Sequence, residues 1–466
     1  MTTPLHISDS GWRAVIADGF TVPRLAAVAA ALADLFPAKR ALLGFDNRFL
    51  SEACGHHVAA LLSGKGWRVD LIPEIFPTPG VAKLVRDSGG AYDFGLEITA
   101  SHNPYYYNGF KILDARGGLI DRNAADRLEK AANEILAEKK RVPALPFDTG
   151  RRFAPLADAS ALRERYLDAI LARVDAAAIR SAKLTVAWDA FGGTVAPLFP
   201  KFLDRLGARS SSVPTAMEPT YGRRRLEPDE SSLGELRSLA PKTGAIAGLA
   251  TDVDGDRFSA VDETGAYVPN NPLGSLMVWY LLAVRGERGA VYQTVSCSAM
   301  TERICAEFGV PLKIEPVGFM KMGRDMGGDA SPLIGIEETG GMAYGPHLPF
   351  KDGLMAHALL LEMLAARKKT IPALLHELGK KYGRFHYRRI DLKLPSEAEV
   401  EKRLDPALWE RRTGEAIAKT STLDGVKWTF PSGWVLIRRS KTEPLLRIYF
   451  ESEDASFVER IAREAS

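Results

Sequence analysis

The sequence has little of what marks secreted, membrane-spanning or nucleic-acid-binding proteins. Its 466 residues include only three cysteines, Cys54, Cys297 and Cys305, which are too few and too scattered for a disulfide framework or a zinc site. No apolar run reaches the roughly 18 residues that span a bilayer, and the N-terminal residues lack the pattern of a secretory signal. The net charge of +3 is small for this length, which argues against a dedicated nucleic-acid binder. We therefore expect a cytoplasmic protein with no membrane or nucleic-acid partner.

Short apolar runs alternate with helical patterns along most of the chain. Residues 40–45, 67–72 and 92–99 have the composition of strands that are buried on both faces. Residues 51–62 have the apolar spacing of a helix, and residues 123–140 predict a long amphipathic helix. This alternation is typical of α/β layers, in which helices cover both faces of a sheet.

The alternation restarts twice and then changes character. A proline-containing stretch at residues 141–150 is typical of a linker. From about Tyr387 onward, three strand-like runs and a short terminal helix predict an α+β unit instead. We expect three similar α/β domains with mixed sheets flanked by helices, followed by a smaller C-terminal α+β domain. The predicted domains span residues 1–150, 151–265, 266–383 and 384–466.

The segment TDVDGDRF places Asp252, Asp254 and Asp256 at alternate positions of a turn. Three carboxylates in this pattern can converge on one hard cation such as Mg²⁺ or Ca²⁺. They would repel one another without a cation, and Arg257 alone cannot neutralise them. A calcium EF-hand is disfavoured because its sixth position must be glycine and is Arg257 here, although Glu263 stands at the twelfth position.

Two further loops carry polar side chains in suggestive patterns. In GIEETGG, Glu337 and Thr339 follow a strand two positions apart, so both can face one pocket, although a glycine-rich turn of this kind is as often only a turn. GPHLPFKDG follows with His347 and Lys351. In RRSKTEPLLR, guanidinium, ammonium and hydroxyl donors crowd one short turn, which suits a phosphate dianion better than a solvated basic hairpin. The donors of this turn are Arg438, Ser440, Lys441, Thr442 and Arg447.

Ser101 directly follows a buried strand, where open α/β sheets bind ligands. Together with a metal loop and a phosphate loop, this position indicates phosphoryl transfer, with His102 and Lys111 as local cationic or proton-handling partners. A serine hydrolase is disfavoured because His102 is adjacent in sequence and would point away from the hydroxyl, and no G-x-S-x-G elbow is present.

TASHNP, DVDGDR, EETGG and RRSKTEP, in this order, resemble the four signature loops of the α-D-phosphohexomutase family. SGWR, GFDNR, PTP and HLPFKDG also resemble family blocks, so the likeness covers nearly the whole chain. It implies four domains around a central cleft, each contributing one loop. It further implies that Ser101 is phosphorylated in the active enzyme and that Ser101 and the three aspartates bind one Mg²⁺ per chain.

The resemblance also implies roles for the remaining loops. Glu337 and Thr339 match residues that grip sugar hydroxyls, and Arg13 matches an arginine near the reacting phosphate. Arg257, His347 and Lys351 are expected at the substrate, and the RRSKTEP loop is expected to hold its phosphate. The implied reaction interconverts hexose 1-phosphate and hexose 6-phosphate through a hexose 1,6-bisphosphate, which also serves as activator. The expected partners are small sugar phosphates, and no obligate protein partner is evident.

The chain departs from the family pattern at several positions. Thr339 replaces the usual serine and keeps its hydroxyl, and Lys441 replaces a glycine or asparagine of the phosphate loop. Where many members read GFK, this chain reads GFMKM, so that Met320 occupies the lysine position and Lys321 stands beside it. Glu338 makes the sugar loop more similar to glucose-specific members than to dual mannose/glucose members.

Other functions stay open at this point. Phosphoglucomutase is favoured, with phosphomannomutase, a dual enzyme or an amino-sugar phosphomutase as alternatives. A metal-dependent phosphatase would explain the aspartates but not the RRSKTEP loop. The basic, aromatic segment at residues 380–389 could contact nucleic acid, but a domain connection that runs into a strand explains it better.

Overall fold

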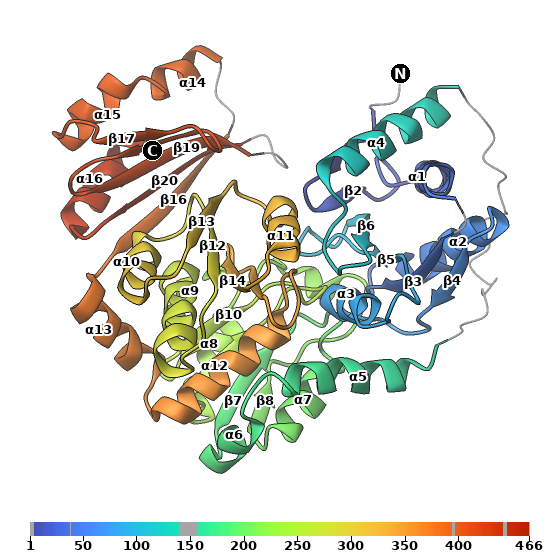
Figure 1. Ribbon diagram of the computed structural model, residues 1–466, viewed down its shortest axis with the longest axis horizontal. Coiled ribbons are helices and arrows are strands. Elements are labelled where there is room, and N and C mark those ends of the chain that lie inside the picture. The colour runs from blue at the N-terminus through green and yellow to red at the C-terminus, as the bar shows by residue number, and fades with distance from the viewer. Residues whose placement is uncertain (1–3, 38, 139–156, 394–396, 441–444, 466) are drawn as a thin grey trace. The chain divides into compact units, whose positions relative to one another are not determined.

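The computed structural model describes residues 4–37, 39–138, 157–393, 397–440 and 445–465 (Figure 1). The predicted linker at 141–150 lies outside these residues, as do Lys441 and Thr442. The described chain divides into two compact units. Unit 1 comprises Met1–Pro269, Phe319–Gly335 and Thr339–Ile371, and unit 2 comprises Asn270–Gly318, Ile336–Glu338 and Pro372–Ser466.

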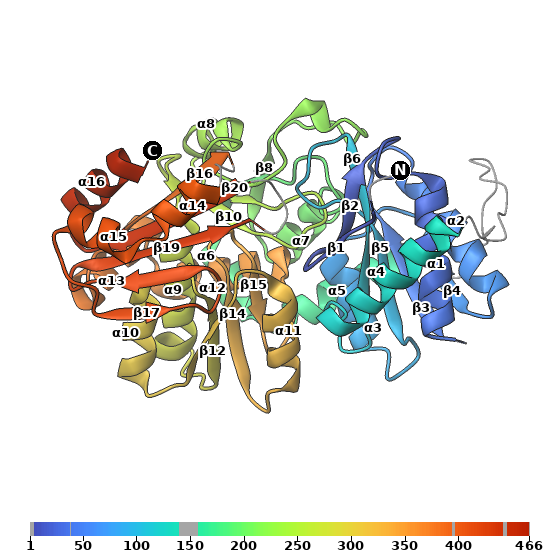
Figure 2. The same cartoon turned by 90° about the horizontal axis from the view of Figure 1, so that it is seen from above.

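The first sheet is a mixed, six-stranded layer with the strand order β1-β2-β6-β5-β3-β4. Its centre is parallel, because β3 pairs in parallel with both β4 and β5, and β6 then runs antiparallel to β5 and β2. Helices α1 and α4 pack together beside this sheet (Figure 2). The strands are β1 (Ile7–Ser8), β2 (Gly11–Val15), β3 (Arg40–Phe45), β4 (Arg68–Leu71), β5 (Phe94–Ile98) and β6 (Tyr107–Asp114). The helices are α1 (Val22–Leu35), α2 (Ser51–Gly64), α3 (Thr78–Arg86) and α4 (Arg122–Ala137).

The second sheet has five strands in the order β11-β10-β9-β7-β8 and is again mixed. Strand β7 pairs in parallel with β8 and β9, whereas β10 runs antiparallel to β9 and β11. The strands are β7 (Thr185–Asp189), β8 (Arg209–Ser212), β9 (Ala247–Ala250), β10 (Ser259–Asp262) and β11 (Tyr267–Val268). The helices are α5 (Ala159–Leu171), α6 (Ala176–Ala182), α7 (Phe199–Arg205), the short 3₁₀ helix η1 (Tyr221–Arg223) and α8 (Gly234–Lys242).

A third α/β region follows along the chain. Its strands β12 and β13 pair in parallel. Helix α9 continues directly into a π-helical turn, η2. The strands are β12 (Ala290–Thr294), β13 (Leu312–Glu315), β14 (Pro332–Ile336) and β15 (Met342–Tyr344). The helices are α9 (Asn270–Trp279), η2 (Tyr280–Val284), α10 (Ala299–Phe308), α11 (Phe319–Gly328), α12 (Gly353–Arg367) and α13 (Ile371–Tyr382).

The C-terminal region is an antiparallel sheet with the strand order β16-β20-β19-β18-β17. One face carries its own apolar core, which includes the fully buried Trp409 and Phe450. The strands are β16 (His386–Lys393), β17 (Lys419–Ser421), β18 (Val426–Thr429), β19 (Gly433–Arg439) and β20 (Leu445–Ser452). The helices are α14 (Glu397–Arg403), α15 (Pro406–Thr413) and α16 (Ala455–Ala465).

The predicted fold class is confirmed: three α/β regions with mixed sheets precede a C-terminal α+β domain. The strand predicted at residues 40–45 matches β3, and the helix predicted at 51–62 is α2. Residues 380–389 connect the end of α13 to β16, as the sequence favours. All three cysteines are unpaired and buried. Among the described helices, none is long and apolar enough to cross a membrane.

Candidate active site

Ser101 stands three residues after β5, at the carboxyl end of the first sheet. Its backbone is left-handed, with φ of 53°, which is unusual for a residue other than glycine. Its N–H donates to the Thr99 hydroxyl at 2.9 Å, and its own hydroxyl donates to Asp252 Oδ2 at 2.7 Å. The Ser101 side chain is buried, so the reacting hydroxyl predicted from sequence lies directly on the predicted metal loop.

The three aspartates follow β9 and converge as their spacing predicts. One oxygen from each of Asp252, Asp254 and Asp256 lies within 4.8 Å of the others, and all three side chains are buried. The turn requires Gly255, because its φ of +78° is left-handed and a Cβ there would come within 2.4 Å of the Val195 side chain. The other oxygen of Asp252 accepts bonds from the N–H groups of Asp256 and Arg257 at 3.0 and 3.1 Å.

Two lysines neutralise this cluster, and sequence reasoning missed this function for them. Lys111, on β6, contacts Asp254 and lies 2.8 Å from Asp256 Oδ2. Lys351 lies 3.3 Å from Asp256 Oδ1. Arg257 alone does not neutralise the aspartates, as the sequence indicates, and Lys111 reaches them from a strand about 140 residues earlier in the chain. Arg257 pairs instead with Glu227 at 2.7 Å.

The three aspartates of the cluster differ in how their pKa values are shifted. Burial raises the pKa of Asp252 to about 7, and the carboxylates of Asp254 and Asp256 add to this effect. Burial alone would also raise the pKa of Asp256, but Lys111 and Lys351 outweigh it and hold that pKa below its usual range. Lys111 is itself held charged, because Asp254 and Asp256 outweigh burial and raise its pKa.

The donor set of the cluster fits a hard divalent cation. Every side-chain ligand is an oxygen, and Asp254 Oδ1 is buried without a hydrogen-bond partner among the described residues. An unpaired oxygen in such a place is typical of a site that takes an ion or water. Asp252, Asp254 and Asp256 could therefore hold one Mg²⁺, and the Ser101 hydroxyl is close enough to add an oxygen.

His102, Arg13 and Arg257 border Ser101. Burial and the charges of Arg257 and Arg13 hold the pKa of His102 well below its usual range, so its imidazole is neutral. Its two nitrogens lie 3.4 Å from the Ser101 hydroxyl and 3.4 Å from the Arg257 guanidinium. Arg13, on β2, donates to the Asn103 side chain at 2.8 Å. The structure thus brings together four cationic or proton-handling residues predicted from sequence, including Lys111.

The predicted sugar loop is partly joined to the metal loop within unit 1. The Phe258 N–H donates to the Gly340 carbonyl at 2.9 Å, and Arg257 forms an antiparallel bridge with Gly341. These contacts fix the turn that carries Thr339, which is half-buried. In unit 2, Glu337 is buried directly after β14.

Glu338 has structural contacts that sequence reasoning did not foresee. Its Oε2 accepts bonds from the hydroxyls of Thr294 at 3.1 Å and Ser296 at 2.7 Å. The polar residues Thr294 and Ser296, at and just after the end of β12, are the sequence signal that could have indicated these contacts. Glu338 is the residue on which the sequence argument for glucose rests, and one of its carboxylate oxygens accepts hydrogen bonds from within the protein.

His347 is placed inside the fold rather than on a surface. It is fully buried, and its Nε2 lies 2.9 Å from Asp352 Oδ2. The other oxygen of Asp352 accepts from the Tyr166 hydroxyl at 2.9 Å and from the Met355 N–H at 3.0 Å, which begins α12. These contacts give His347 a structural part, and its predicted contact with substrate stays a prediction.

The C-terminal loop places two arginines side by side. Arg438 on β19 and Arg447 on β20 are direct cross-strand partners, so their side chains share one face of the sheet. Asp424 lies 3.0 Å from the Arg438 Nε and also accepts the Val317 N–H, and Asp391 lies 3.7 Å from the Arg447 Nε. Burial alone would lower the pKa of Arg438, but Tyr449 and Asp424 outweigh it.

Asp424 and Asp391 offset part of the repulsion between these opposed like charges, and the binding of phosphate here stays a prediction. The Ser440 N–H donates to the Leu445 carbonyl at 2.8 Å and closes the described part of the turn.

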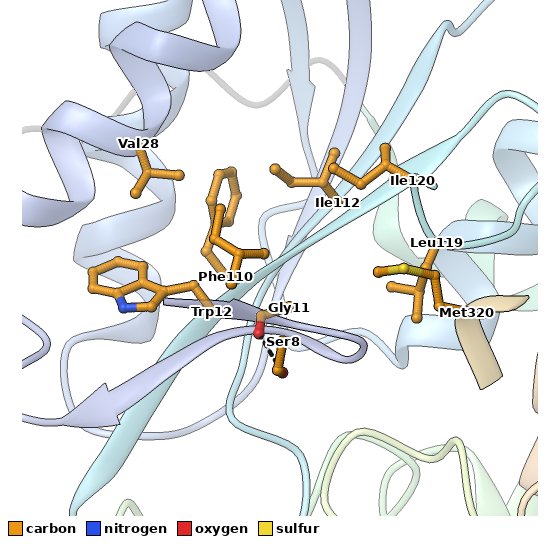
Figure 3. A pocket seen from close by; sticks show the side chains of 10 residues that line it. Ser8, Gly11, Trp12, Val28, Phe110, Ile112, Leu119, Ile120 and Met320 are labelled. Carbon is orange, nitrogen blue, oxygen red and sulfur yellow. Dashed lines mark hydrogen bonds between the residues drawn. The ribbon is translucent and has the colours of Figure 1, made fainter. Parts of the chain in front are cut away.

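Met320 and Lys321 both lie on α11 but have different surroundings. Met320 is buried in a small apolar pocket, where Figure 3 shows its thioether beside Leu119. Lys321 is half-exposed and pairs with Asp325 one turn along the helix. The lysines that pair with the aspartates of the cluster are Lys111 and Lys351, whereas the described partner of Lys321 is Asp325.

Comparison with known proteins shows the family of the chain. Models of the four domains of phosphoglucomutase/phosphomannomutase match the chain in order, as α/β/α domains I, II and III and the C-terminal domain. The matched residues are 6–139, 164–265, 269–382 and 390–466. The chain belongs to the phosphoglucomutase/phosphomannomutase family, whose members are isomerase-class phosphotransferases.

Individual relatives carry several substrate names. The chain is 29% identical to a phosphoglucosamine/phosphogalactosamine mutase of Sulfurisphaera tokodaii, over 83% of this chain and 82% of the relative. It is also 29% identical to a phosphoglucomutase/phosphomannomutase of Thermococcus kodakarensis, over 88% and 86%. A crystal structure described as a putative phosphomannomutase from Thermus thermophilus superposes with a TM-score of 0.83 at 29% identity, covering 100% of this chain and 99% of that one.

Proposed function

We propose that the protein interconverts hexose 1-phosphate and hexose 6-phosphate and that Ser101 carries the phosphoryl group. The observation that supports this most strongly is the Ser101 hydroxyl, which lies 2.7 Å from Asp252 within a buried cluster of three carboxylates. A buried serine on an oxygen-rich cation site suits phosphoryl transfer, which depends on positioning and charge neutralisation more than on covalent help.

The proposed reaction has two transfers. Phospho-Ser101 gives its phosphoryl group to the free O1 or O6 hydroxyl of a hexose monophosphate, which forms the hexose 1,6-bisphosphate. The sugar hydroxyl loses its proton in this step, and the Ser101 oxygen, released from phosphorus, gains one. After the sugar turns over, the Ser101 hydroxyl attacks the other phosphoryl group and loses its proton, and the sugar oxygen that leaves phosphorus gains one. When bound, Mg²⁺ would neutralise charge on the transferring group.

The residues around Ser101 have separable proposed parts. Neutral His102 is poised to exchange a proton at the Ser101 Oγ, which lies 3.4 Å from its Nδ1. Lys111 and Lys351 balance the aspartates, and Arg13 and Arg257, whose charges act on His102, would attract the anionic phosphoryl group. Burial of Ser101 and the aspartates keeps water from hydrolysing the phosphoserine.

Other predicted residues would recognise the substrate. Glu337 and Thr339 would bind sugar hydroxyls that keep nearly equivalent places when the sugar turns over. Arg438, Ser440 and Arg447 would hold the phosphate that does not react. Lys441 and Thr442 belong to the same proposed loop but lie outside the described residues.

Glucose phosphate is our proposed substrate, following the similarity of the EET loop to glucose-specific members. Glucosamine phosphate is the second candidate, since relatives such as the enzyme of Methanocaldococcus jannaschii, 27% identical, are named phosphoglucosamine mutases. The ratio of kcat/KM for glucose, mannose and glucosamine 1-phosphates decides between them. A ratio above about ten in favour of glucosamine would replace glucose in the proposal.

The phosphoserine is tested by intact-mass and peptide analysis after incubation with glucose 1,6-bisphosphate. We expect one added phosphate at Ser101, none in Ser101→Ala, and nearly complete loss of mutase activity in that variant. Ser181→Ala, which changes a serine on α6, is the control and should match the parent enzyme. Phosphate on another residue, or release of inorganic phosphate in place of isomerisation, would contradict the proposal and favour a phosphatase.

A further inference from the structure

Arg48, in the turn after β3, makes an unusual set of contacts with the segment that begins at Ser101. Its guanidinium is fully buried, and its two terminal nitrogens donate to four backbone carbonyls. The four carbonyls belong to Ser101, Asn103 at 2.7 Å, Pro104 at 2.7 Å and Tyr107 at 3.1 Å. One side chain thus binds both ends of the loop that carries the reacting hydroxyl.

Asp46 fixes the guanidinium in this orientation. The remaining donor, Arg48 Nε, lies 3.0 Å from Asp46 Oδ2 in an ion pair whose two side chains are completely buried. The other oxygen of Asp46 accepts from the Arg48 N–H at 2.9 Å and from the Ser51 hydroxyl at 2.7 Å. The Asp46 N–H donates to the Ile98 carbonyl at 3.0 Å, which ties the turn to the end of β5.

The loop needs such support because its first residue is strained. Ser101 has φ of 53°, and for a residue with a Cβ the left-handed conformation costs about 1–2 kcal/mol. That conformation directs the Ser101 hydroxyl to Asp252, at 2.7 Å. Arg48 binds the carbonyl of this same residue. The hydrogen bond from Arg48 therefore acts on the residue that carries the reacting hydroxyl.

We propose that Arg48, oriented by Asp46, is a positioning residue for phosphoryl transfer at Ser101. It holds the Ser101 backbone in the left-handed conformation that aims the hydroxyl at the cation site. This inference rests on the proposed function of Ser101, but neither Arg48 nor Asp46 is among the site residues predicted from the sequence. Only a guanidinium has enough donors in a fixed plane for four carbonyls and a carboxylate, so a lysine cannot replace it fully.

The test compares Arg48→Ala and Arg48→Lys with a matched control, Arg224→Ala. Arg224 also pairs with a fully buried carboxylate, Asp189, in unit 1, but it makes no described contact with the Ser101 loop. The measurements are the rate at which glucose 1,6-bisphosphate phosphorylates Ser101, followed by intact mass, together with kcat, KM and the melting temperature.

We expect Arg48→Ala to slow phosphorylation of Ser101 and to lower kcat by about a hundredfold, the usual effect of a misplacement near 1 Å, with KM changed less than about threefold. Arg48→Lys should fall between Arg48→Ala and the parent. Millimolar guanidinium should restore part of the rate in Arg48→Ala alone. Arg224→Ala should lower the melting temperature while its phosphorylation rate stays within about threefold of the parent.

Three results would overturn the inference. The first is a parental phosphorylation rate in Arg48→Ala, or in Arg48→Lys if the alanine variant does not fold. The second is an equal loss of rate in Arg224→Ala, which would show a general effect of removing a buried ion pair. The third is a loss confined to KM. Failure of the parent enzyme itself to gain phosphate at Ser101 would instead overturn the proposed function.

Discussion

Lys111 shows at the scale of single residues how the cation site is balanced. It is buried and bonded to Asp254 and Asp256, so Lys111→Met leaves two buried carboxylates without their main partner. Breaking a buried pair from one side costs about 3–5 kcal/mol. We expect the metal-free variant to melt well below the parent and saturating Mg²⁺ to raise its melting temperature more than that of the parent.

Lys83→Met is the matched control for this experiment. Lys83 is also buried, but its partner Asp87 is half-exposed and lies far along the chain from the aspartates of the cluster. Its melting temperature should respond to Mg²⁺ as that of the parent does. An equal response in Lys111→Met and the parent would separate Lys111 from the metal site.

The residues of the site differ in how far the sequence predicts them. Asp252, Asp254 and Asp256 are predicted because alternate positions of one turn converge by local geometry alone. Arg48 and Glu227 are not, because their partners lie about 53 and 30 residues away and meet them only in the folded chain. Sequence reasoning therefore finds residues that act together within one loop and misses residues that support a loop from another element.

At the scale of elements, α12 carries a histidine that makes stability depend on pH. His357 is fully buried against the rings of Phe199 and Phe258, and burial lowers its pKa from 6.5 to about 4. In the unfolded chain His357 binds a proton below about pH 6.5, whereas in the folded chain it stays neutral until the pH falls to about 4. His357 therefore contributes stability above pH 6.5 that is lost as the pH falls toward 4, by about 3 kcal/mol in all.

His357→Gln tests this linkage by removing the titration. Between pH 7 and pH 4 the melting temperature of the parent should fall more steeply than that of the variant, even though the variant is less stable at pH 7. Parallel curves for the two proteins would refute the assignment of this acid sensitivity to His357.

The end of β14 offers two adjacent glutamates with different expected parts. Glu338 accepts bonds from Thr294 and Ser296, and removing an acceptor from buried hydroxyls costs about 1–3 kcal/mol. Glu338→Met should therefore lower the melting temperature. Glu337→Gln should instead lower kcat/KM for the sugar phosphate at nearly unchanged melting temperature. The reverse pattern, seen by thermal melts and steady-state kinetics, would exchange the two assignments.

At the scale of the whole molecule, the sequence predicts the four regions of the fold better than it predicts which elements belong to which of the two compact units. Strand and helix patterns repeat locally, so each α/β layer can be read from its own residues. The third region does not stay together, however: α12 packs against α5 and α6 and belongs to unit 1, whereas α9 and α10 belong to unit 2. Side-chain packing decides which helices pair when they lie far apart in the sequence, and the periodicity of apolar residues does not encode this packing.

The two units also carry different parts of the proposed reaction, and kinetics can separate them. Ser101 and the aspartates lie in unit 1, whereas Arg438 lies in unit 2, opposite Arg447 and bonded to Asp424. Loss of a charge-assisted bond to phosphate costs about 1.5–3 kcal/mol, or roughly ten- to a hundredfold in kcat/KM. Arg438→Ala should therefore raise KM for glucose 1-phosphate by that factor while the affinity for Mg²⁺ stays at the parental value.

Arg388→Ala is the control for the C-terminal sheet. Arg388 lies on β16 of the same sheet, but it is exposed and pairs with Glu459 on the surface, so its loss should change KM less than about twofold. Unchanged kinetics in Arg438→Ala would make the RRSKTEP turn a basic hairpin with no part in binding. A weakened Mg²⁺ affinity in that variant would mean that the effect reaches the aspartates, and the assignment of phosphate recognition to unit 2 would then fail.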